Sequence, residues 1–177
     1  MFDRPAVVLE PAARQPVEAA ADPPSVIDAG PDGARKIDDL QSGPVETLPV
    51  TDEWVTVPAA AGDVRVRIVK PVDAGAVLPV VVYVHGGGGI PGNAATHDRL
   101  VRELVVGAHA AVAFVVLRDE GDTYAAKHRS ADVPVATVRH DGTVHDLMLL
   151  NSLTDTRATR ASGDRATGLL RAALAAK

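Results

Sequence analysis

Apolar and polar residues alternate along a short stretch in the first half of the chain. Residues 64–69, Val-Arg-Val-Arg-Ile-Val, show the period of two that is typical of a half-exposed β-strand, and residues 53–57 predict a second short strand before it. Because only residues 58–63 separate these strands, we predict that they pair antiparallel. Residues 78–84 instead form an apolar run, which predicts a central parallel strand buried on both faces.

The spacing of apolar residues changes to a helical period after this run. Residues 97–106 carry leucines and valines four positions apart, which predicts an amphipathic helix. We expect Thr96 to cap its N-terminus and Gly107 to follow its last turn as a C′ glycine.

Strands and helices continue to alternate toward the C-terminus. Residues 111–117 and 133–139 predict strands, residues 119–129 predict a helix between them, and residues 154–175 predict a closing helix. One side of the closing helix is expected to carry its apolar residues, which are Ala158, Ala161, Ala166, Leu169, Leu170, Ala173 and Leu174. This alternation indicates the α/β class with right-handed crossovers.

The first 50 residues have a different character from the rest. They are rich in Pro, Ala and Asp and contain several turn signals, with short helices expected near residues 11–20 and 34–41. We interpret residues 1–50 as a cap-like segment that precedes a core at residues 51–177.

Composition limits the classes of partner. The 177 residues carry a net charge of −5, no basic cluster and 3% aromatic residues, which argues against nucleic acid. The chain has no cysteine, its start lacks the pattern of a signal peptide, and its apolar runs are too short to span a bilayer. We therefore expect a soluble cytoplasmic protein without membrane contact.

A histidine and a run of glycines follow the apolar strand at residues 78–84. The sequence there is His85-Gly86-Gly87-Gly88, with Gly92-Asn93 shortly after. Glycines at the end of a buried strand let backbone amides point into a cavity, where they can hold an oxyanion during acyl transfer. A plain Gly-rich turn and a phosphate-binding loop remain alternatives.

Two further features lie near the C-terminal third. His145 stands on a loop before the closing helix, and residues 117–121, Leu-Arg-Asp-Glu-Gly, place an acidic pair before a helix. Taken alone, the histidine is typical of a surface loop and the acidic pair of a helix N-terminus. Combined with the glycine loop, they resemble the hormone-sensitive-lipase family of α/β-hydrolases, in its bacterial esterase branch, over most of the chain.

The resemblance implies roles for these residues. Gly87 and Gly88 would supply oxyanion-hole amides, His145 would be the base of the catalytic triad, and His85 and Gly86 would support the loop. The family has an aromatic residue directly after the third glycine, and this chain has Gly89 there.

The residues that would complete such a triad are absent. The family's nucleophile is a serine in a G-x-S-x-G elbow, and none of the five serines has that context: Ser25, Ser42, Ser130, Ser152 and Ser162. The position of the triad acid corresponds to Val115. The sequence therefore reads as two ends of a hydrolase joined near residues 115–117, without the three strands, elbow and acid between them.

These features predict a truncated α/β-hydrolase: a mostly parallel sheet of about five strands with flanking helices. The expected strand order is residues 53–57, 64–69, 111–117, 78–84 and 133–139. With its neighbours missing, the sheet would leave apolar patches that favour self-association.

The functional expectation is ester-hydrolase ancestry without ester hydrolysis, because a triad without its nucleophile forms no acyl-enzyme. An alternative is a module that binds a small acyl ester or carboxylate at the glycine loop without turning it over. A metal-assisted hydrolase using His85, His97, His140 and His145 is disfavoured, because these histidines lack helical ligand spacing. Neither a metal nor another cofactor is expected.

Overall fold

The computed structural model describes residues 8–21, 41, 47–58, 63–75, 77–84, 93–115, 129–131, 133, 143–144 and 146–175. Within these, the chain forms the following elements: helix α1 (Pro11–Ala21), strands β1 (Val50–Val57), β2 (Val64–Pro71) and β3 (Val80–Val84), helix α3 (Asp98–Ala108), strand β4 (Ala111–Val115), the 3-10 helix η1 (Asn151–Leu153) and helix α5 (Arg157–Ala175). In the described part, no helix is both long and apolar enough to cross a lipid bilayer.

The sheet has the order β1-β2-β4-β3, which confirms the predicted order of the first four strands. The pairs β1–β2 and β2–β4 are antiparallel and β3–β4 is parallel, so the described sheet is mixed and not mostly parallel as expected. The expected fifth strand, at residues 133–139, lies outside the described residues except for Val133, which is not in a strand. The expected helix at residues 119–129 also lies outside them, except for Arg129.

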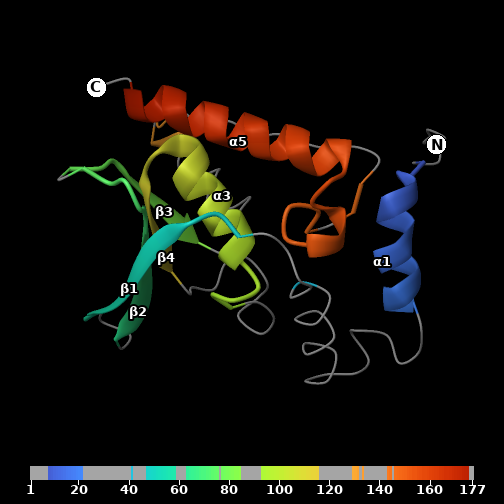
Figure 1. The fold of residues 1–177 in the computed structure, drawn as a ribbon, viewed down its shortest axis with the longest axis horizontal. Helices are drawn as coiled ribbons and strands as arrows, with labels where there is room; N and C mark the ends of the chain where they lie inside the picture. Colours follow the sequence, from blue (N-terminus) through green and yellow to red (C-terminus); the bar gives the residue numbers. More distant parts are fainter. Residues whose placement is uncertain are drawn as a thin grey trace.

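The described elements stack in three layers: the sheet, then α3, then α5 (Figure 1). The predicted i, i+4 stripe of α3 faces the sheet and forms the core with residues of β2 and β4: Val69, Leu100, Val101, Leu104, Val105, Val112 and Phe114. Helix α1 lies at the far side of the molecule, where it contacts η1 (Figure 1). The core is therefore built mainly around α3.

Helix α3 ends later than the sequence predicts, and Gly107 has a different role. The helix continues to Ala108, and His109, at φ 49°, forms its left-handed C-cap. Gly107 therefore lies inside the helix, where a Cβ atom would come within 2.5 Å of the Cγ2 methyl of Thr167 on α5. The missing side chain lets α3 and α5 approach closely, so Gly107 serves helix packing and does not terminate the helix.

Strand β3 is buried on one face only, which corrects the prediction of a strand buried on both. Val81 and Tyr83 pack against the core, whereas Val80, Val82 and Val84 are 58, 65 and 44% exposed. The physical reason is that α3 covers one face of the sheet, and successive side chains of a strand point to opposite faces. The continuous apolar run at residues 78–84 therefore did not mean that both faces of the strand are buried.

Helix α5 begins at Arg157, three residues after its predicted start, and packs along α3. Its buried residues are Thr159 and Ser162, and Ala166 and Leu170 pack against the core. On the predicted apolar side, Ala161, Leu169 and Ala173 are exposed. The predicted face was wrong in part, because α5 buries Thr159 and Ser162 and brings Thr167 against Gly107 of α3.

Candidate functional site

The residues proposed from the sequence lie just beyond the described segments. His85, Gly86, Gly87, Gly88 and His145 are all outside the described residues, so their roles stay predictions. The structure does describe the residues that flank them. These are the end of β3 before the glycine loop, the turn from Asn93 after it, and the segment from Asp146 after His145.

An aromatic cluster joins the two ends of the glycine loop. Tyr83 of β3 packs edge-on to His97, with ring centroids 5.9 Å apart, and is stacked on Phe114 of β4 at 5.5 Å. His97 also contacts Phe114, at 5.5 Å. Because Tyr83 precedes the loop and His97 follows it, their contact closes the loop at its base.

The residues after the loop form a tight turn around Asn93. Its side-chain oxygen accepts hydrogen bonds from the backbone amides of Ala95 (2.7 Å) and Thr96 (3.2 Å), an Asx-type turn. The Thr96 hydroxyl lies 3.0 Å from both the Asn93 carbonyl and the Nδ1 atom of His97. Thr96 therefore stabilises the turn, and the predicted N-cap role was wrong because the N-cap position of α3 is His97.

A buried ion network fixes this turn to the sheet. Arg67 of β2, with a side chain 10% exposed, donates to Asp52 of β1 (2.8 Å) and to Asp98 of α3 (2.7 Å). The other Asp98 oxygen accepts from Arg102 at 2.6 Å, and Arg67 also reaches the Ala94 carbonyl at 3.4 Å. The hydrogen bond from Arg67 is the main cause that holds the pKa of the Asp52 carboxyl below its usual value. The alternation at residues 64–69 predicted an exposed position for Arg67, and paired carboxylates are what permit its burial.

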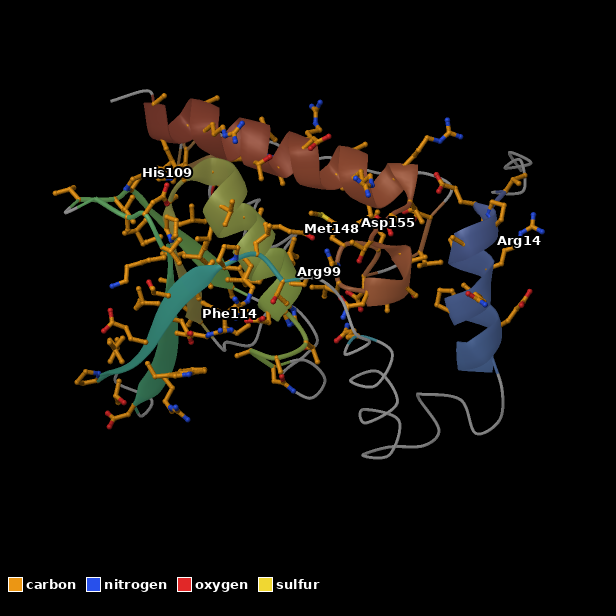
Figure 2. The ribbon with its side chains drawn as sticks, viewed as in Figure 1. Arg14, Arg99, His109, Phe114, Met148 and Asp155 are labelled. Carbon is orange, nitrogen blue, oxygen red and sulfur yellow. The ribbon has the colours of Figure 1, made fainter. Side chains whose placement is uncertain are left out.

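Arg99, one residue further along α3, links the helix to the C-terminal part of the chain. Its guanidinium donates to the side-chain oxygen of Asn151 (2.8 Å), to Glu103 (2.8 Å) and to the backbone carbonyl of Met148. Figure 2 shows Arg99 on the side of α3 that faces the segment carrying Met148. Three consecutive residues, His97, Asp98 and Arg99, thus join three different parts of the fold.

The flanks of the two predicted loops lie near each other. Asp146 directly follows His145, and the negative charge of its carboxylate acts on the hydroxyl of Tyr83. Burial and, to a lesser extent, this negative charge raise the pKa of Tyr83 to about 12. Asp146 itself adopts a left-handed backbone conformation, with φ 61°. The carboxyl ends of parallel strands are where α/β proteins place their sites, and both flanks lie at that end of β3.

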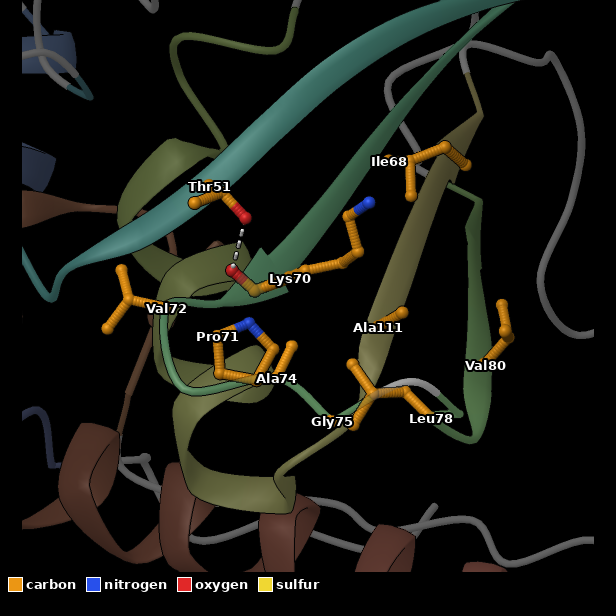
Figure 3. Close-up of a pocket in the computed structure, with 10 residues that line it drawn as sticks. All are labelled: Thr51, Ile68, Lys70, Pro71, Val72, Ala74, Gly75, Leu78, Val80 and Ala111. Carbon is orange, nitrogen blue, oxygen red and sulfur yellow. Dashed lines mark hydrogen bonds between the residues drawn. The ribbon is translucent and has the colours of Figure 1, made fainter.

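A separate cavity of about 520 Å³ opens at the opposite edge of the sheet (Figure 3). Its walls come from the start of β1, the second half of β2, the segment between β2 and β3, and the first residues of β3 and β4: Thr51, Ile68, Lys70, Pro71, Val72, Ala74, Gly75, Leu78, Val80 and Ala111. Lys70 is paired there with the exposed Glu53 at 2.9 Å. The cavity therefore does not belong to the predicted site.

No described serine stands on a strand-to-helix elbow. Ser162 lies within α5, and its hydroxyl donates to the Ala158 carbonyl at 2.7 Å. Ser152 is in η1. Val115, at the position of the expected triad acid, is the last residue of β4 and pairs with Val84 and Val66. Of the four histidines weighed as metal ligands, the structure describes His97, and the described residues contain no group of three or more metal-binding side chains.

The curated proteins that resemble this chain are named as hydrolases. Protein R526 of Acanthamoeba polyphaga mimivirus, named as an alpha/beta hydrolase, is 32% identical over 108 residues, which are 60% of this chain and 31% of that protein. Carboxylic ester hydrolase LipN of Mycobacterium tuberculosis is 38% identical over 68 residues, which are 38% of this chain and 17% of LipN. The chain thus spans about a third or less of the length of these relatives. No protein-family model matches it.

The fold agrees with that of solved esterase structures. A thermostable esterase from Pseudomonas putida ECU1011 superposes with a TM-score of 0.77 at 18% identity, with 98% of this chain and 99% of that chain covered. At this level of identity the likeness establishes the fold. The described sheet and helices therefore have an α/β-hydrolase arrangement.

Proposed function

We propose that the chain derives from the α/β-hydrolases of the esterase type, as the names of its relatives and its fold suggest, and that it does not itself hydrolyse carboxylic esters. The observation that carries the proposal is the absence of a nucleophile in the sequence: none of its five serines has the G-x-S-x-G context. The motif from His85 to Gly88, followed by Asn93, supports assigning the chain to the hormone-sensitive-lipase branch.

The described structure supports this proposal at two positions. Ser162 is buried, and its hydroxyl is bonded within α5, so it has neither the exposure nor the turn that a nucleophile needs. At the position of the acid, Val115 supplies an apolar side chain in a strand. A histidine base without a nucleophilic serine can act only on water.

The test is ester hydrolysis by the purified chain. We expect no release of p-nitrophenol from p-nitrophenyl acetate or butyrate above the rate of a His145→Ala variant prepared in the same way. We also expect no labelling by a fluorophosphonate probe, which reacts covalently with activated serines. Labelling, or hydrolysis that is lost in His145→Ala, would show that a working nucleophile is present.

We further propose that the glycine loop retains the capacity to bind a small acyl ester or carboxylate without turning it over. The supporting observation is that the described base of the loop is intact. The Tyr83–His97 contact, the Asn93 turn and the Arg67–Asp98 pair are all formed. A fixed base on both sides of the loop favours its amides in binding an oxyanion, because backbone donors that are already oriented cost least to align.

Calorimetry or NMR titration with butyrate tests this second proposal. We expect binding by the wild-type chain, weaker binding by Gly88→Val, and unchanged binding by Gly75→Ala, a glycine with open space around it at the opposite edge. Butylamine serves as the ligand control, because it keeps the apolar tail and replaces the negative charge with a positive one. Absence of butyrate binding, or equal binding of both ligands, would contradict the proposal.

A further inference from the structure

A cavity of about 520 Å³ lies where β3 and β4 begin, away from the predicted site. Its volume falls within the roughly 300–1,000 Å³ that is typical of small-molecule sites. Of the ten described residues that line it, eight have no polar atom in the side chain, and the other two are Thr51 and Lys70. Figure 3 shows Thr51 and Lys70 on one side of the cavity and Leu78, Val80 and Ala111 on the other. The lining is therefore apolar with one polar margin.

The apolar part of the lining belongs to the sheet face opposite α3. Val69 and Val112 pack into the core against α3, so their neighbours Ile68 and Ala111 point to the other face. Val80 lies on that face too, because it pairs with Ala111, and its side chain is 58% exposed. A ligand that covers these three side chains therefore removes apolar surface from water, which is favourable.

The polar margin of the cavity is an ion pair. The ammonium of Lys70 lies 2.9 Å from the carboxylate of Glu53, and Glu53 pairs in register with Ile68, so it stands on the same face of the sheet. Lys70 is the charged residue among the ten that line the cavity, and Glu53 balances its charge. The pair still presents both kinds of hydrogen-bonding group, because an ammonium has three donors and a carboxylate several acceptor positions.

We propose that this cavity is a binding site for a neutral amphiphile, a short aliphatic chain that carries one hydroxyl group. The chain lies against Ile68, Leu78 and Val80, and the hydroxyl accepts a hydrogen bond from Lys70 and donates one to Glu53. A carboxylate in the same place is repelled by Glu53, and an ammonium is repelled by Lys70. The inference does not rest on the proposed function, because every residue that carries it lies outside the predicted site.

Three ligands with the same chain and different head groups test the proposal: 1-hexanol, hexanoate and hexylammonium. The measurement is an NMR titration that follows the methyl signals of Ile68, Leu78 and Val80, so that binding elsewhere on the chain does not enter it. We expect saturable shifts with 1-hexanol, and about fivefold or more weaker binding of the two charged ligands. Absence of a saturable shift with 1-hexanol, or equal affinity for all three ligands, would overturn the inference.

A matched pair of variants separates the cavity from the rest of the apolar face. Val80 lines the cavity, whereas Val82 is 65% exposed on the same face of the same strand and does not line it. Val80→Thr keeps the branched shape and should weaken 1-hexanol binding by about threefold or more, because it replaces an apolar methyl in the contact. Val82→Thr should leave the binding unchanged. Equal effects would mean that 1-hexanol adheres to the whole face, which contradicts a defined site.

Glu53→Gln tests the role of the ion pair. Glu53 is 58% exposed, so the substitution leaves the core intact, and the ammonium of Lys70 loses the charge that balances it. We expect the affinity for hexanoate at the cavity methyls to rise by about fivefold or more. The affinity for 1-hexanol should change little, because the glutamine side-chain oxygen still accepts a hydrogen bond. An unchanged affinity for hexanoate would show that Glu53 does not select the ligand, and would overturn the proposal.

Discussion

At the scale of single residues, two buried arginines shape the described site from opposite sides. Arg67 connects the strands to the start of α3, and Arg99 connects α3 to the segment that follows His145. Both lie where a sequence pattern predicts ordinary surface positions. Burial of each guanidinium is possible because carboxylates and carbonyls accept its hydrogen bonds.

Replacing Arg67 with methionine should destabilise the chain. The substitution keeps the apolar stem but leaves the carboxylates of Asp52 and Asp98 without their shared partner, and we expect a loss of about 3 kcal/mol in the free energy of unfolding. Urea unfolding monitored by circular dichroism measures it. Lys70→Met is the matched control: it removes an exposed pair with Glu53 and should change stability by less than about 0.5 kcal/mol. Equal effects of the two substitutions would refute the assigned role of Arg67.

The same network predicts a pH dependence. Because Arg67 depresses the pKa of Asp52 in the folded state, the stabilisation is present above the unfolded-state pKa of about 4 and is lost as pH falls through the folded pKa. Stability should therefore decline as the pH is lowered below about 4. In Asp52→Asn this part of the decline should be missing. Urea unfolding at several pH values between 7 and 3 compares the two chains, and parallel curves would contradict the prediction.

At the scale of elements, the contact between α3 and α5 depends on a glycine. Gly107→Ala improves helix propensity, yet its Cβ would come within 2.5 Å of the Thr167 methyl. We expect steric crowding to outweigh propensity and to destabilise the chain by about 1–3 kcal/mol. Thermal unfolding of Gly107→Ala alone and combined with Thr167→Ala measures the effect, and the second substitution should recover part of the loss.

Gly163 and Gly168 of α5 give the opposite prediction. An added Cβ meets nothing within 4 Å at either position, so only the entropy of the unfolded chain and helix propensity decide the outcome. Each Gly→Ala substitution should stabilise the chain by about 0.5–1 kcal/mol. A loss of stability in either variant would mean that α5 packs differently from the described structure.

The alternating and helical patterns were sufficient to predict the described strands and the core face of α3, and the family resemblance supplied the order of the strands. They could not predict what depends on partners distant in sequence. The burial of Arg67 requires two aspartates from other elements, and the lack of room for a side chain at Gly107 comes from Thr167, sixty residues later. The exposure of one face of β3 depends on which faces of the sheet are covered by helices, and the sequence of the strand does not indicate this. Of the site, the sequence identified the glycine loop and His145 as candidates, but no pattern marked Tyr83 or Arg99 as their supports.

At the scale of the whole molecule, the face of the sheet opposite α3 is strongly apolar. One row of paired residues on it runs across all four described strands: Val55, Val66, Val115 and Val84. Val57, Val80 and Val82 extend this face, and the valines of β1 and β3 on it are all exposed, whereas Val66 of β2 is buried. The exposed valines of β1 and β3 on this face favour association between copies of the chain.

A charge placed on this face should weaken association. Val82 is 65% exposed on β3, and we expect Val82→Lys to shift the chain toward monomer in sedimentation or light-scattering measurements without lowering its melting temperature. Val77→Lys adds the same charge at a 90% exposed loop position and should have little effect. A wild-type chain that remains monomeric at high concentration would contradict the expectation of self-association.

The position of α5 on top of α3 also has a consequence during protein synthesis. Roughly fifty residues separate the end of α3 from the start of α5. At roughly 5–20 residues per second, a ribosome needs about 2–10 s to add them. Throughout that interval α3 has been synthesised but α5 has not, so the surface of α3 around Gly107 lacks the helix that covers it in the folded chain. The yield of folded chain should therefore depend on translation speed between codons 109 and 157, and chaperones that bind nascent apolar surfaces have their longest opportunity there.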